Sequence, residues 1–281
     1  MAISKLDFDY ISRLAHVEAA LMIEPGKEYL VETRLGPVAQ REGFATLTDF
    51  IGVLRGQAKV NGLHHKAIDA LTTNETLFFR DYHPFEALRK TILPEIIAQR
   101  GHLRRLSLWS AASSTGQEAY SLAMMIREHF PQLANWNISI LATDLSPTVL
   151  KIAQAGVYSQ LEVNRGLPAN YLVKYFTKQD DKWYLKEEIK KMVEFRPMNL
   201  IQSWPVMPPM DLIFIRNVMI YFDVETQKTI LKKIRNCLLP HGLLFLGTAE
   251  TTANLDPAYQ AVTHGKAVVY RVLSPDPQPA K

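Results

Sequence analysis

Cysteine is almost absent from the sequence, which has only Cys237 among 281 residues. One cysteine excludes an internal disulfide, a redox-active cysteine pair and any metal site built from several thiolates. Such usage is typical of a reducing compartment, so we expect a cytoplasmic protein. Because Cys237 lies on the apolar side of a predicted helix, we interpret it as a core residue rather than a nucleophile.

Long apolar runs and a dominant charge are also missing. The most hydrophobic stretch, residues 212–222, is interrupted by Arg216 and Asn217, and the N-terminus lacks a signal-peptide pattern. We therefore expect neither membrane insertion nor export. The 32 basic and 28 acidic residues leave a net charge of +4, too small by itself to indicate a nucleic-acid-binding protein.

Several chemical motifs are absent as well. The sequence has no P-loop, no G-x-S-x-G nucleophile elbow and no G-x-G-x-x-G phosphate turn, and its eight histidines show no metal-ligand spacing. These absences argue against a nucleotide triphosphatase, a hydrolase and a metal centre. The 47% of hydrophobic residues is nevertheless enough for one substantial core or two smaller ones.

The first hundred residues have a helical pattern. Between Leu6 and Leu71 the apolar residues recur at three- and four-residue intervals, which predicts a small all-helical domain over residues 1–73. Pro37 should begin, end or kink one of its helices. Residues 74–102 are predicted to be a linker and a connecting helix, the helix running from Tyr82 to Arg100 and interrupted near Pro94.

From residue 103 onward the pattern changes to short apolar strands that alternate with helices. This alternation predicts an α/β domain over residues 103–273, with a parallel sheet covered by helices on both faces. We expect its strands at residues 105–109, 138–142, 193–196, 212–215 and 243–246, and its helices at residues 118–129, 147–154 and, capped by Asp223, up to Leu239. Residues 157–192 are polar and rich in lysine, which predicts an inserted subdomain, and residues 274–281 are predicted to be disordered.

The first strand, turn and helix predict a ligand pocket. A turn of small residues at the carboxyl end of a parallel strand lets a ligand approach the backbone. This turn has only one glycine, Gly116, and Glu118 stands where an anion would otherwise bind. That pattern favours a cationic or polyhydroxylated ligand over a phosphate. The alternative is an ordinary tight turn with Glu118 as a favourable first-turn acid.

Two further polar positions follow predicted strands. Asp144 at the end of the second strand is suited to accept both hydroxyls of a ribose, and the alternative capping role is already filled by Ser146. Arg216 and Asn217 follow the central strand 211–215, where burial requires partners, so a carboxylate and a ligand are predicted nearby. The alternative there is a purely structural ion pair. Tyr221 is predicted to face the same crevice.

Residues 72–80 lie at the junction of the two domains and remain open to two interpretations. Their polar head, Thr72-Thr-Asn74-Glu-Thr76, either caps a helix or contacts a ligand, and Arg80 is left to solvent or to a bound anion.

Four segments together resemble one family, the CheR chemotaxis receptor methyltransferases. They are residues 74–80 (Asn-Glu-Thr-Leu-Phe-Phe-Arg), 109–123, 142–146 (Ala-Thr-Asp-Leu-Ser) and 211–222, in the family's order and spacing, and residues 239–247 with Glu250 extend the likeness. The resemblance implies a Rossmann-like methyltransferase domain with a helical N-terminal domain and an inserted small β subdomain. It also implies transfer of the methyl group of S-adenosylmethionine to glutamate side chains on the cytoplasmic helices of chemoreceptors, with S-adenosylhomocysteine as product.

The resemblance also implies a set of cofactor contacts. By the resemblance, three linker residues, Asn74, Thr76 and Arg80, contact the cofactor. Glu118 binds its methionine end and Asp144 its ribose. Asn199 and Leu200 flank the adenine, and Arg216 and Asn217 complete the site. No base or metal is required, because a glutamate is already ionised at neutral pH and the sulfonium is a strong electrophile.

We hypothesise that Arg80 orients the substrate carboxylate and that Tyr221 hydrogen-bonds near the transferring methyl group. Arg34 and Arg41, seven residues apart, either present a basic face to an acidic receptor region or lie on an ordinary solvated helix face, and Pro37 between them argues against a shared face. A monomer is expected, and no nucleic-acid partner.

The sequence departs from the family pattern at the first turn and in the insertion. Ala112-Ser113 stand where Gly-Cys is common, Gln117 replaces a frequent glutamate and Ala119 a frequent proline. The methyl group of Ala112 is tolerable if its backbone stays outside the region that favours glycine. Residues 177–183 are short and lack glycine, which predicts no tight binding of a receptor C-terminal pentapeptide.

Two alternative functions remain at this stage. One is a non-catalytic S-adenosylmethionine-binding scaffold, because fold alone does not prove activity. The other is a dinucleotide-dependent oxidoreductase, against which the missing phosphate loop counts.

Overall fold

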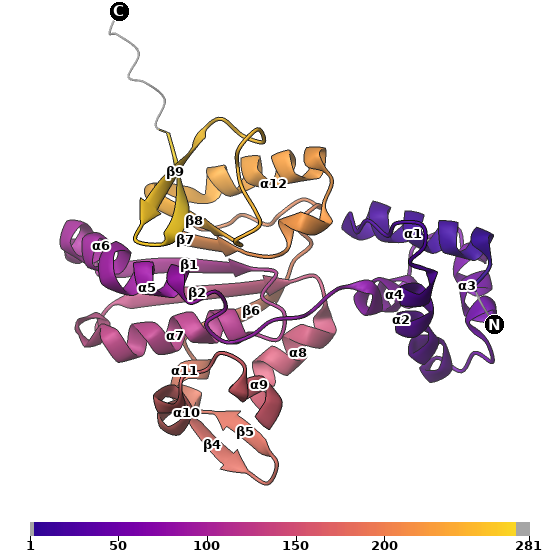
Figure 1. The fold of residues 1–281 in the computed structure, drawn as a ribbon, viewed down its shortest axis with the longest axis horizontal. Helices are drawn as coiled ribbons and strands as arrows, with labels where there is room; N and C mark the ends of the chain where they lie inside the picture. Colours follow the sequence, from indigo (N-terminus) through magenta and orange to yellow (C-terminus); the bar gives the residue numbers. More distant parts are fainter. Residues whose placement is uncertain (1–2, 274–281) are drawn as a thin grey trace, which may run out of the picture.

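A computed structural model describes residues 3–273, and it confirms the predicted α/β fold (Figure 1). Three parts are visible: a central sheet with its helices, four N-terminal helices beside it, and a small inserted sheet. The predicted disorder of residues 274–281 concerns positions outside the described residues. Among residues 3–273, no helix is long and apolar enough to cross a membrane.

The central sheet has seven strands in the order β6-β2-β1-β7-β8-β10-β9. Its first five strands in that order are parallel, and β10 pairs antiparallel with both β8 and β9. The strands are β1 (Arg105–Ala111), β2 (Asn137–Asp144), β6 (Val193–Pro197), β7 (Met210–Ile215), β8 (Leu238–Leu246), β9 (Tyr259–His264) and β10 (Ala267–Val272).

Both faces of the sheet are buried, because successive side chains of its central strands alternate between two hydrophobic cores. Leu108 and Leu212 belong to the core under α7 (Gln117–His129), whereas Trp109 and Ile213 belong to the core under α12 (Val224–Cys237). The half-buried Cys237 packs against the second core. Helix α8 (Pro147–Ala155) begins at the predicted Ser146 cap, and the predicted Asp223 cap accepts from the backbone of Thr226.

The N-terminal helices form a separate third core. They are α1 (Lys5–Ala19), α2 (Glu28–Arg41), α3 (Leu47–Gly56) and α4 (Gly62–Leu71). Side-chain caps from Ser4, Thr46 and Asn61 begin three of them. Pro37 lies inside α2, which neither begins nor ends there, so Arg34 and Arg41 share one helix.

The connecting helix is continuous but irregular. It consists of α5 (His83–Ala87), a π-helical turn η1 (Leu88–Ile92) and α6 (Leu93–Arg100), followed by a 3₁₀ turn η2 (Gly101–Leu103). The π turn lies directly before Pro94, the position at which an interruption was predicted. Because proline has no backbone N–H, the regular helical hydrogen bond at Pro94 is missing. The wider π turn falls beside this gap in the hydrogen bonding of the helix.

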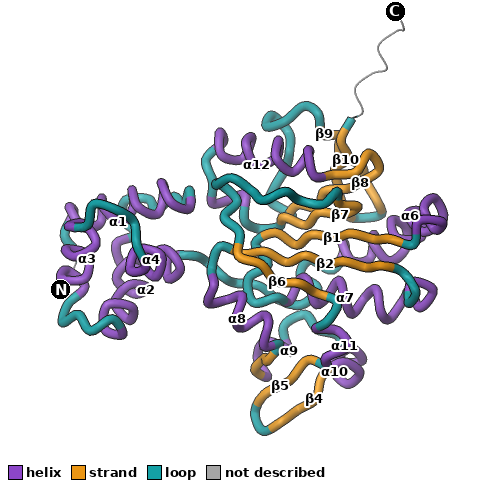
Figure 2. The backbone as a smooth tube through the Cα atoms, turned by 180° about the vertical axis from the view of Figure 1, so that it is seen from behind, coloured by secondary structure: helices purple, strands orange, loops and turns teal. Residues whose placement is uncertain are grey.

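The insertion, residues 157–192, folds into a three-stranded antiparallel sheet with the order β3-β5-β4 (Figure 2). Its elements are β3 (Val157–Ser159), α9 (Gln160–Asn164), α10 (Ala169–Tyr175), β4 (Phe176–Gln179), β5 (Lys182–Leu185) and α11 (Glu187–Lys190). Short 3₁₀ turns η3 (Pro131–Leu133) and η4 (Met219–Tyr221) complete the elements.

One predicted boundary is wrong. Helix α12 was expected to reach Leu239, but it ends at Cys237, and Leu238 already pairs with Met210 of β7. The register then shifts between Met210 and Leu212. Pairing with a buried parallel neighbour therefore overrides the helical pattern of the last two leucines.

Candidate active site

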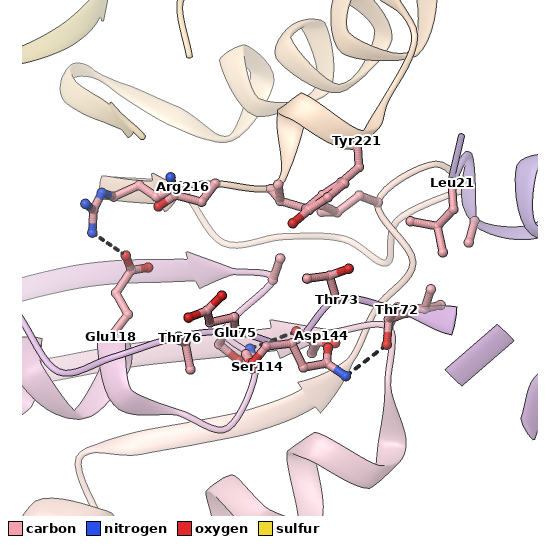
Figure 3. A pocket seen from close by; sticks show the side chains of 18 of the residues that line it. Leu21, Thr72, Thr73, Glu75, Thr76, Ser114, Glu118, Asp144, Arg216 and Tyr221 are labelled. Atoms are coloured by element: carbon pink, nitrogen blue, oxygen red, sulfur yellow. Dashed lines mark hydrogen bonds and ion pairs between the residues drawn. The ribbon is translucent and has the colours of Figure 1, made fainter. Parts of the chain in front are cut away.

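One cavity lies at the carboxyl ends of β1, β2 and β7 (Figure 3). Here β1 is flanked by β2 on one side and β7 on the other, and ligands of open α/β sheets bind at such a point. The cavity has an empty volume of about 930 Å³, including space open to solvent. It is lined by every residue that the sequence assigned to the cofactor, namely Asn74, Thr76, Arg80, Glu118, Asp144, Asn199, Leu200, Arg216 and Asn217, and by Tyr221.

The turn between β1 and α7 forms one wall of the cavity. Its backbone is strongly bent, with φ of 49° at Ser114 and 92° at Gly116. A side chain at Gly116 would meet Ala153 at 3.0 Å and the ring of Tyr120 at 3.2 Å, so glycine is required by space as well as by conformation. The turn thus brings backbone close to the cavity without a glycine-rich phosphate loop.

Ala112 in this turn does not meet the condition under which its methyl group is tolerated without strain. Its φ of 54° lies in the region that favours glycine. A non-glycine residue in the left-handed region costs roughly 1 kcal/mol. The alanine therefore adds backbone strain, besides placing a methyl group at the cavity wall.

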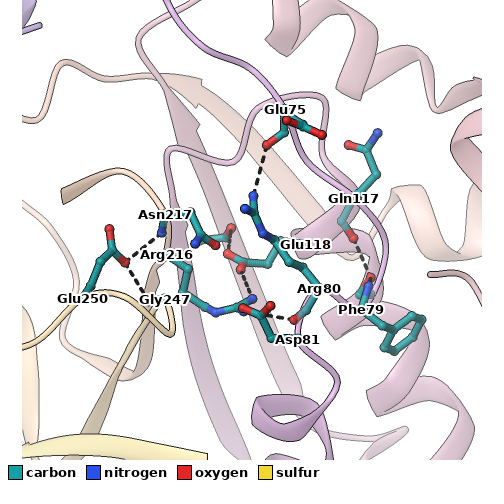
Figure 4. A network of polar contacts seen from close by, with 12 residues as sticks. Glu75, Phe79, Arg80, Asp81, Gln117, Glu118, Arg216, Asn217, Gly247 and Glu250 are labelled. Carbon is teal, nitrogen blue, oxygen red and sulfur yellow. Dashed lines mark hydrogen bonds and ion pairs between the residues drawn. The ribbon is translucent and has the colours of Figure 1, made fainter. Parts of the chain in front are cut away.

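Arg216 forms the centre of a buried ion cluster (Figure 4). Its Nη1 donates to Glu118 Oε2 at 2.9 Å, and its Nη2 donates to Asp81 Oδ2 at 2.6 Å and to the carbonyl oxygen of Arg80 at 3.0 Å. The hydroxyl of Ser110 donates to the other oxygen of Glu118 at 2.8 Å. The predicted carboxylate partner of Arg216 is thus confirmed, and it is a pair of carboxylates.

The sequence left two interpretations of Glu118 and Arg216 open, a ligand site and a structural ion pair, and features of both are present in this cluster. The Arg216 side chain is 2% exposed, and removing either charge would leave the other buried without full compensation. The cluster is therefore structural. Two polar atoms, Arg216 Nε and Asn217 Oδ1, are buried without a hydrogen-bond partner in the described chain, and both residues line the cavity. Unsatisfied buried groups beside a cavity fit a polar ligand.

Asp144 joins the ends of two strands. Its Oδ2 accepts from the backbone N–H of Ser114 at 2.8 Å and its Oδ1 from that of Ser146 at 2.9 Å. Burial raises the pKa of Asp144, and these two amide donors oppose the shift. The hydroxyl of Ser146 caps α8 by accepting from Val149, so the carboxylate is not needed for that task. Each carboxylate oxygen retains a further lone pair for a ligand donor.

The linker, residues 72–82, lines the cavity with residues 72–76 and Arg80, and its second half, residues 78–82, forms a turn. Both interpretations of its polar head hold: Thr72 caps the end of α4, where its backbone N–H and its hydroxyl donate to the carbonyl oxygen of Asp69, and residues 72–76 line the cavity. Ser114 Oγ donates to the carbonyl of Asn74 at 2.7 Å, and Ser121 Oγ accepts from the N–H of Phe79 at 3.0 Å. The linker is thus fixed against the β1–α7 unit.

The N-terminal helices contribute a wall that the sequence did not reveal. Ala19 and Leu21, at and just beyond the end of α1, line the cavity. Asn199 Nδ2 donates to the carbonyl oxygen of Glu18 at 2.7 Å, which joins the loop after β6 to α1. No local motif marks these residues, since only the packing of two domains brings them to the cavity.

Glu250 organises the opposite wall. Its carboxylate accepts from the backbone N–H groups of Gly247 at 2.6 Å, Asn217 at 2.8 Å, Val218 at 2.9 Å and Met219 at 2.7 Å. It thereby fixes the loop that carries Asn217 and leads to Tyr221. Figure 3 shows the Tyr221 side chain directed into the cavity.

Arg34 and Arg41 do not line this cavity. Arg34 donates to the carbonyl oxygen of Leu71 and to Thr73 Oγ1, so its guanidinium is tied to the start of the linker. Arg41 is exposed and donates to the carbonyl of Pro37 in its own helix. Of the two arginines, Arg34 is therefore partly buried against the linker and Arg41 is exposed, and their role toward a substrate stays a prediction.

The ligand chemistry of the site follows from its charges. Carboxylates occur in the Arg216 cluster and at the end of β2, two residues of the lining carry unpartnered polar atoms in the described chain, and the turn offers no phosphate loop. A ligand with an ammonium group, a ribose and a cationic sulfur matches this set. An open α/β sheet with such a cavity fits the class of S-adenosylmethionine-dependent methyltransferases.

Comparison with known proteins identifies the family. Residues 74–268 match the family model described as CheR methyltransferase, SAM binding domain. The chain is 40% identical over 276 residues to chemotaxis protein methyltransferase 1 of Pseudomonas aeruginosa, covering 96% of this chain and 99% of that protein. It is 37% identical to chemotaxis protein methyltransferase Cher2 of Pseudomonas putida, with the same coverage, and 37% identical to chemotaxis protein methyltransferase of Vibrio parahaemolyticus, covering 97% and 98%. The chain belongs to the CheR methyltransferase family.

Proposed function

We propose that this protein transfers the methyl group of S-adenosylmethionine to glutamate side chains of chemoreceptor cytoplasmic domains, forming glutamate methyl esters. The observation that carries the proposal is the convergence of all the predicted cofactor residues on one cavity. Family membership and the names of the relatives support the chemotactic role.

The residues divide the cofactor among them. Glu118 holds the ammonium of the methionine end while sharing Arg216, and Asp144 holds the ribose hydroxyls. Asn199 and Leu200 flank the adenine. The remaining contacts, from the linker and from the loop after β7, are Asn74, Thr76, Arg80 and Asn217.

The chemistry requires alignment more than proton transfer. When bound, S-adenosylmethionine supplies a methyl group on an electrophilic sulfonium. The acceptor glutamate is ionised at neutral pH and needs no base. Arg80 orients its carboxylate, and the Tyr221 hydroxyl hydrogen-bonds at the reacting end of the cavity. Positioning of this kind can supply most of the rate enhancement.

Methyl transfer provides the direct test. We expect base-labile label to appear on receptor-containing membranes incubated with the protein and methyl-labelled S-adenosylmethionine. Binding of the cofactor without any transfer would indicate the non-catalytic scaffold instead. In single-turnover assays, Arg80→Ala and Tyr221→Phe should each slow transfer, and unchanged rates in both would remove their proposed roles.

We further propose that the protein acts without a receptor pentapeptide. Strands β4 and β5 are joined by only two residues, Asp180 and Asp181, so the tip of this hairpin is short and acidic. An acidic tip repels a peptide carboxylate. Calorimetry with a receptor C-terminal pentapeptide should detect no binding, and micromolar affinity would contradict the proposal.

We also propose that the protein is a cytoplasmic monomer, with Arg41 available to an acidic receptor region.

A further inference from the structure

We propose that the insertion positions the cofactor-binding linker, with Gly166 and Arg165 as positioning residues. The inference rests on the proposed function, because it assigns to these two residues an effect on cofactor affinity. Neither residue lines the cavity. Both contact the linker, which does.

Gly166 lies directly against the linker backbone. A Cβ atom at this position would stand 2.1 Å from the carbonyl oxygen of Phe78 and 3.0 Å from the Leu77 side chain. Gly166 also has φ of 85°. Since an ordinary carbon–oxygen contact exceeds 3 Å, even one methyl group must change the distance between this loop and the linker by about 1 Å. The glycine therefore sets how closely the insertion and the linker approach.

Arg165 holds the linker from the neighbouring position. Its Nη2 lies 2.6 Å from Glu75 Oε1, and the two side chains are 44% and 66% exposed. The backbone carbonyl of Glu75 in turn accepts from Arg80 Nη1 at 3.2 Å (Figure 4). A chain of contacts thus runs from the insertion through Glu75 to the arginine proposed to orient the substrate.

Aromatic packing fixes the same segment. The ring of Phe78 is buried, with its centroid 5.1 Å from that of Tyr158 and 5.8 Å from that of Phe176, both in the insertion. The hydroxyl of Tyr158 donates to the carbonyl of Thr115 at 2.8 Å, in the β1–α7 turn. The insertion therefore contacts both walls that meet at the cofactor cavity.

The linker needs such external support because its backbone is strained. Phe79, Asp81 and Tyr82 have φ of 50°, 67° and 47°. Left-handed conformations at three non-glycine residues persist only where surrounding contacts determine them. We infer that contacts from the insertion help to hold the linker in this strained conformation, and that losing them lowers the affinity for the cofactor.

The first experiment compares Gly166→Ala with Gly43→Ala in the full-length protein. Gly43 has φ of 84°, nearly that of Gly166, but a Cβ there meets nothing within 4 Å. Both variants place alanine at nearly the same φ, so they differ in the steric contact with the linker, which only Gly166→Ala creates. We expect the Kd for S-adenosylhomocysteine, measured by calorimetry, to rise at least tenfold in Gly166→Ala and less than twofold in Gly43→Ala.

The second experiment tests Arg165 with substitutions at the surface. Arg165→Ala should weaken S-adenosylhomocysteine binding about two- to fivefold, the range of an exposed ion pair, and Arg165→Lys should restore most of it. The control is Arg196→Ala, which breaks an exposed pair of 2.7 Å with Glu194 away from the linker and should leave binding unchanged. The KM for S-adenosylmethionine should follow the same order.

These outcomes separate the inference from the proposed function. If the wild-type protein binds S-adenosylhomocysteine and transfers methyl groups, but Gly166→Ala and Arg165→Ala bind it as tightly as their controls, the positioning role is wrong. If the wild-type protein binds but does not transfer, the proposed function fails while the affinity comparison still decides the inference. Should Gly166→Ala not fold, the Arg165 series decides alone.

Discussion

Replacing Glu250 by glutamine should destabilise the protein and loosen one wall of the cavity. The carboxylate accepts four backbone N–H groups within 2.9 Å, two at each oxygen. Glutamine keeps one oxygen and turns an NH₂ group toward two of these donors. Hydrogen bonds to a charged group contribute roughly 1.5–3 kcal/mol each, so we expect a loss of about 3 kcal/mol in the free energy of unfolding.

Thermal unfolding followed by circular dichroism measures this effect. A loss of about 3 kcal/mol corresponds to a decrease in Tm of roughly 6–12 °C in a protein of this size. The matched control is Glu225→Gln, since that side chain is 81% exposed and pairs only with Lys228 three residues away. It should change stability by less than about 0.5 kcal/mol. A Tm for Glu250→Gln that equals the control would refute the role of these four hydrogen bonds.

Three other perturbations test the site. Ala112→Gly removes the left-handed strain but adds backbone entropy to the unfolded chain, so calorimetric unfolding should show stability equal to the wild type or up to about 1 kcal/mol higher, and a clear loss would contradict the strain. The hydroxyl groups of the ribose donate hydrogen bonds to the ionised form of Asp144, and the pKa of this residue in the free protein is raised above 3.8. The affinity for S-adenosylhomocysteine should therefore fall as the pH decreases through that pKa. Asp144→Asn, which has no carboxyl group to titrate, should bind with less pH dependence. Arg216→Met leaves Glu118 and Asp81 without their cation, which should cost about 3–5 kcal/mol in urea denaturation, and a variant as stable as wild type would refute the cluster's role.

The five parallel strands were predictable from the sequence because their pattern is local, whereas the antiparallel strands β9 and β10 were not predicted. Each central strand is a short apolar run, and Gly156 and Asp223 mark helix ends by their own backbone or side-chain chemistry. Asp144 was predictable for the same reason, since its place after a buried strand fixes where it lies. Such local patterns can be recognised without knowing which distant residues they contact in the folded protein.

The missing parts of the site depend on contacts between distant segments. Asp81 bonds to Arg216, 135 positions away, and Asn199 bonds to Glu18, 181 positions away. The sequence shows that Arg216 needs a carboxylate but contains many candidates, and it gives no sign that Leu21 reaches the cavity. The backbone conformation of Ala112 could not be predicted, because its φ is imposed by the turn and not by residue type.

The hydrogen bond between Asn199 and Glu18 has a consequence for how this protein can be divided. The cavity has walls from two parts of the chain, because Ala19 and Leu21 at the end of α1 line it together with the sheet. A fragment beginning at residue 74 would retain the sheet and most polar contacts, yet one side of the cavity would open to water. We therefore expect ligand binding to require both parts, and an exchange of either part between relatives must preserve the contacts between them.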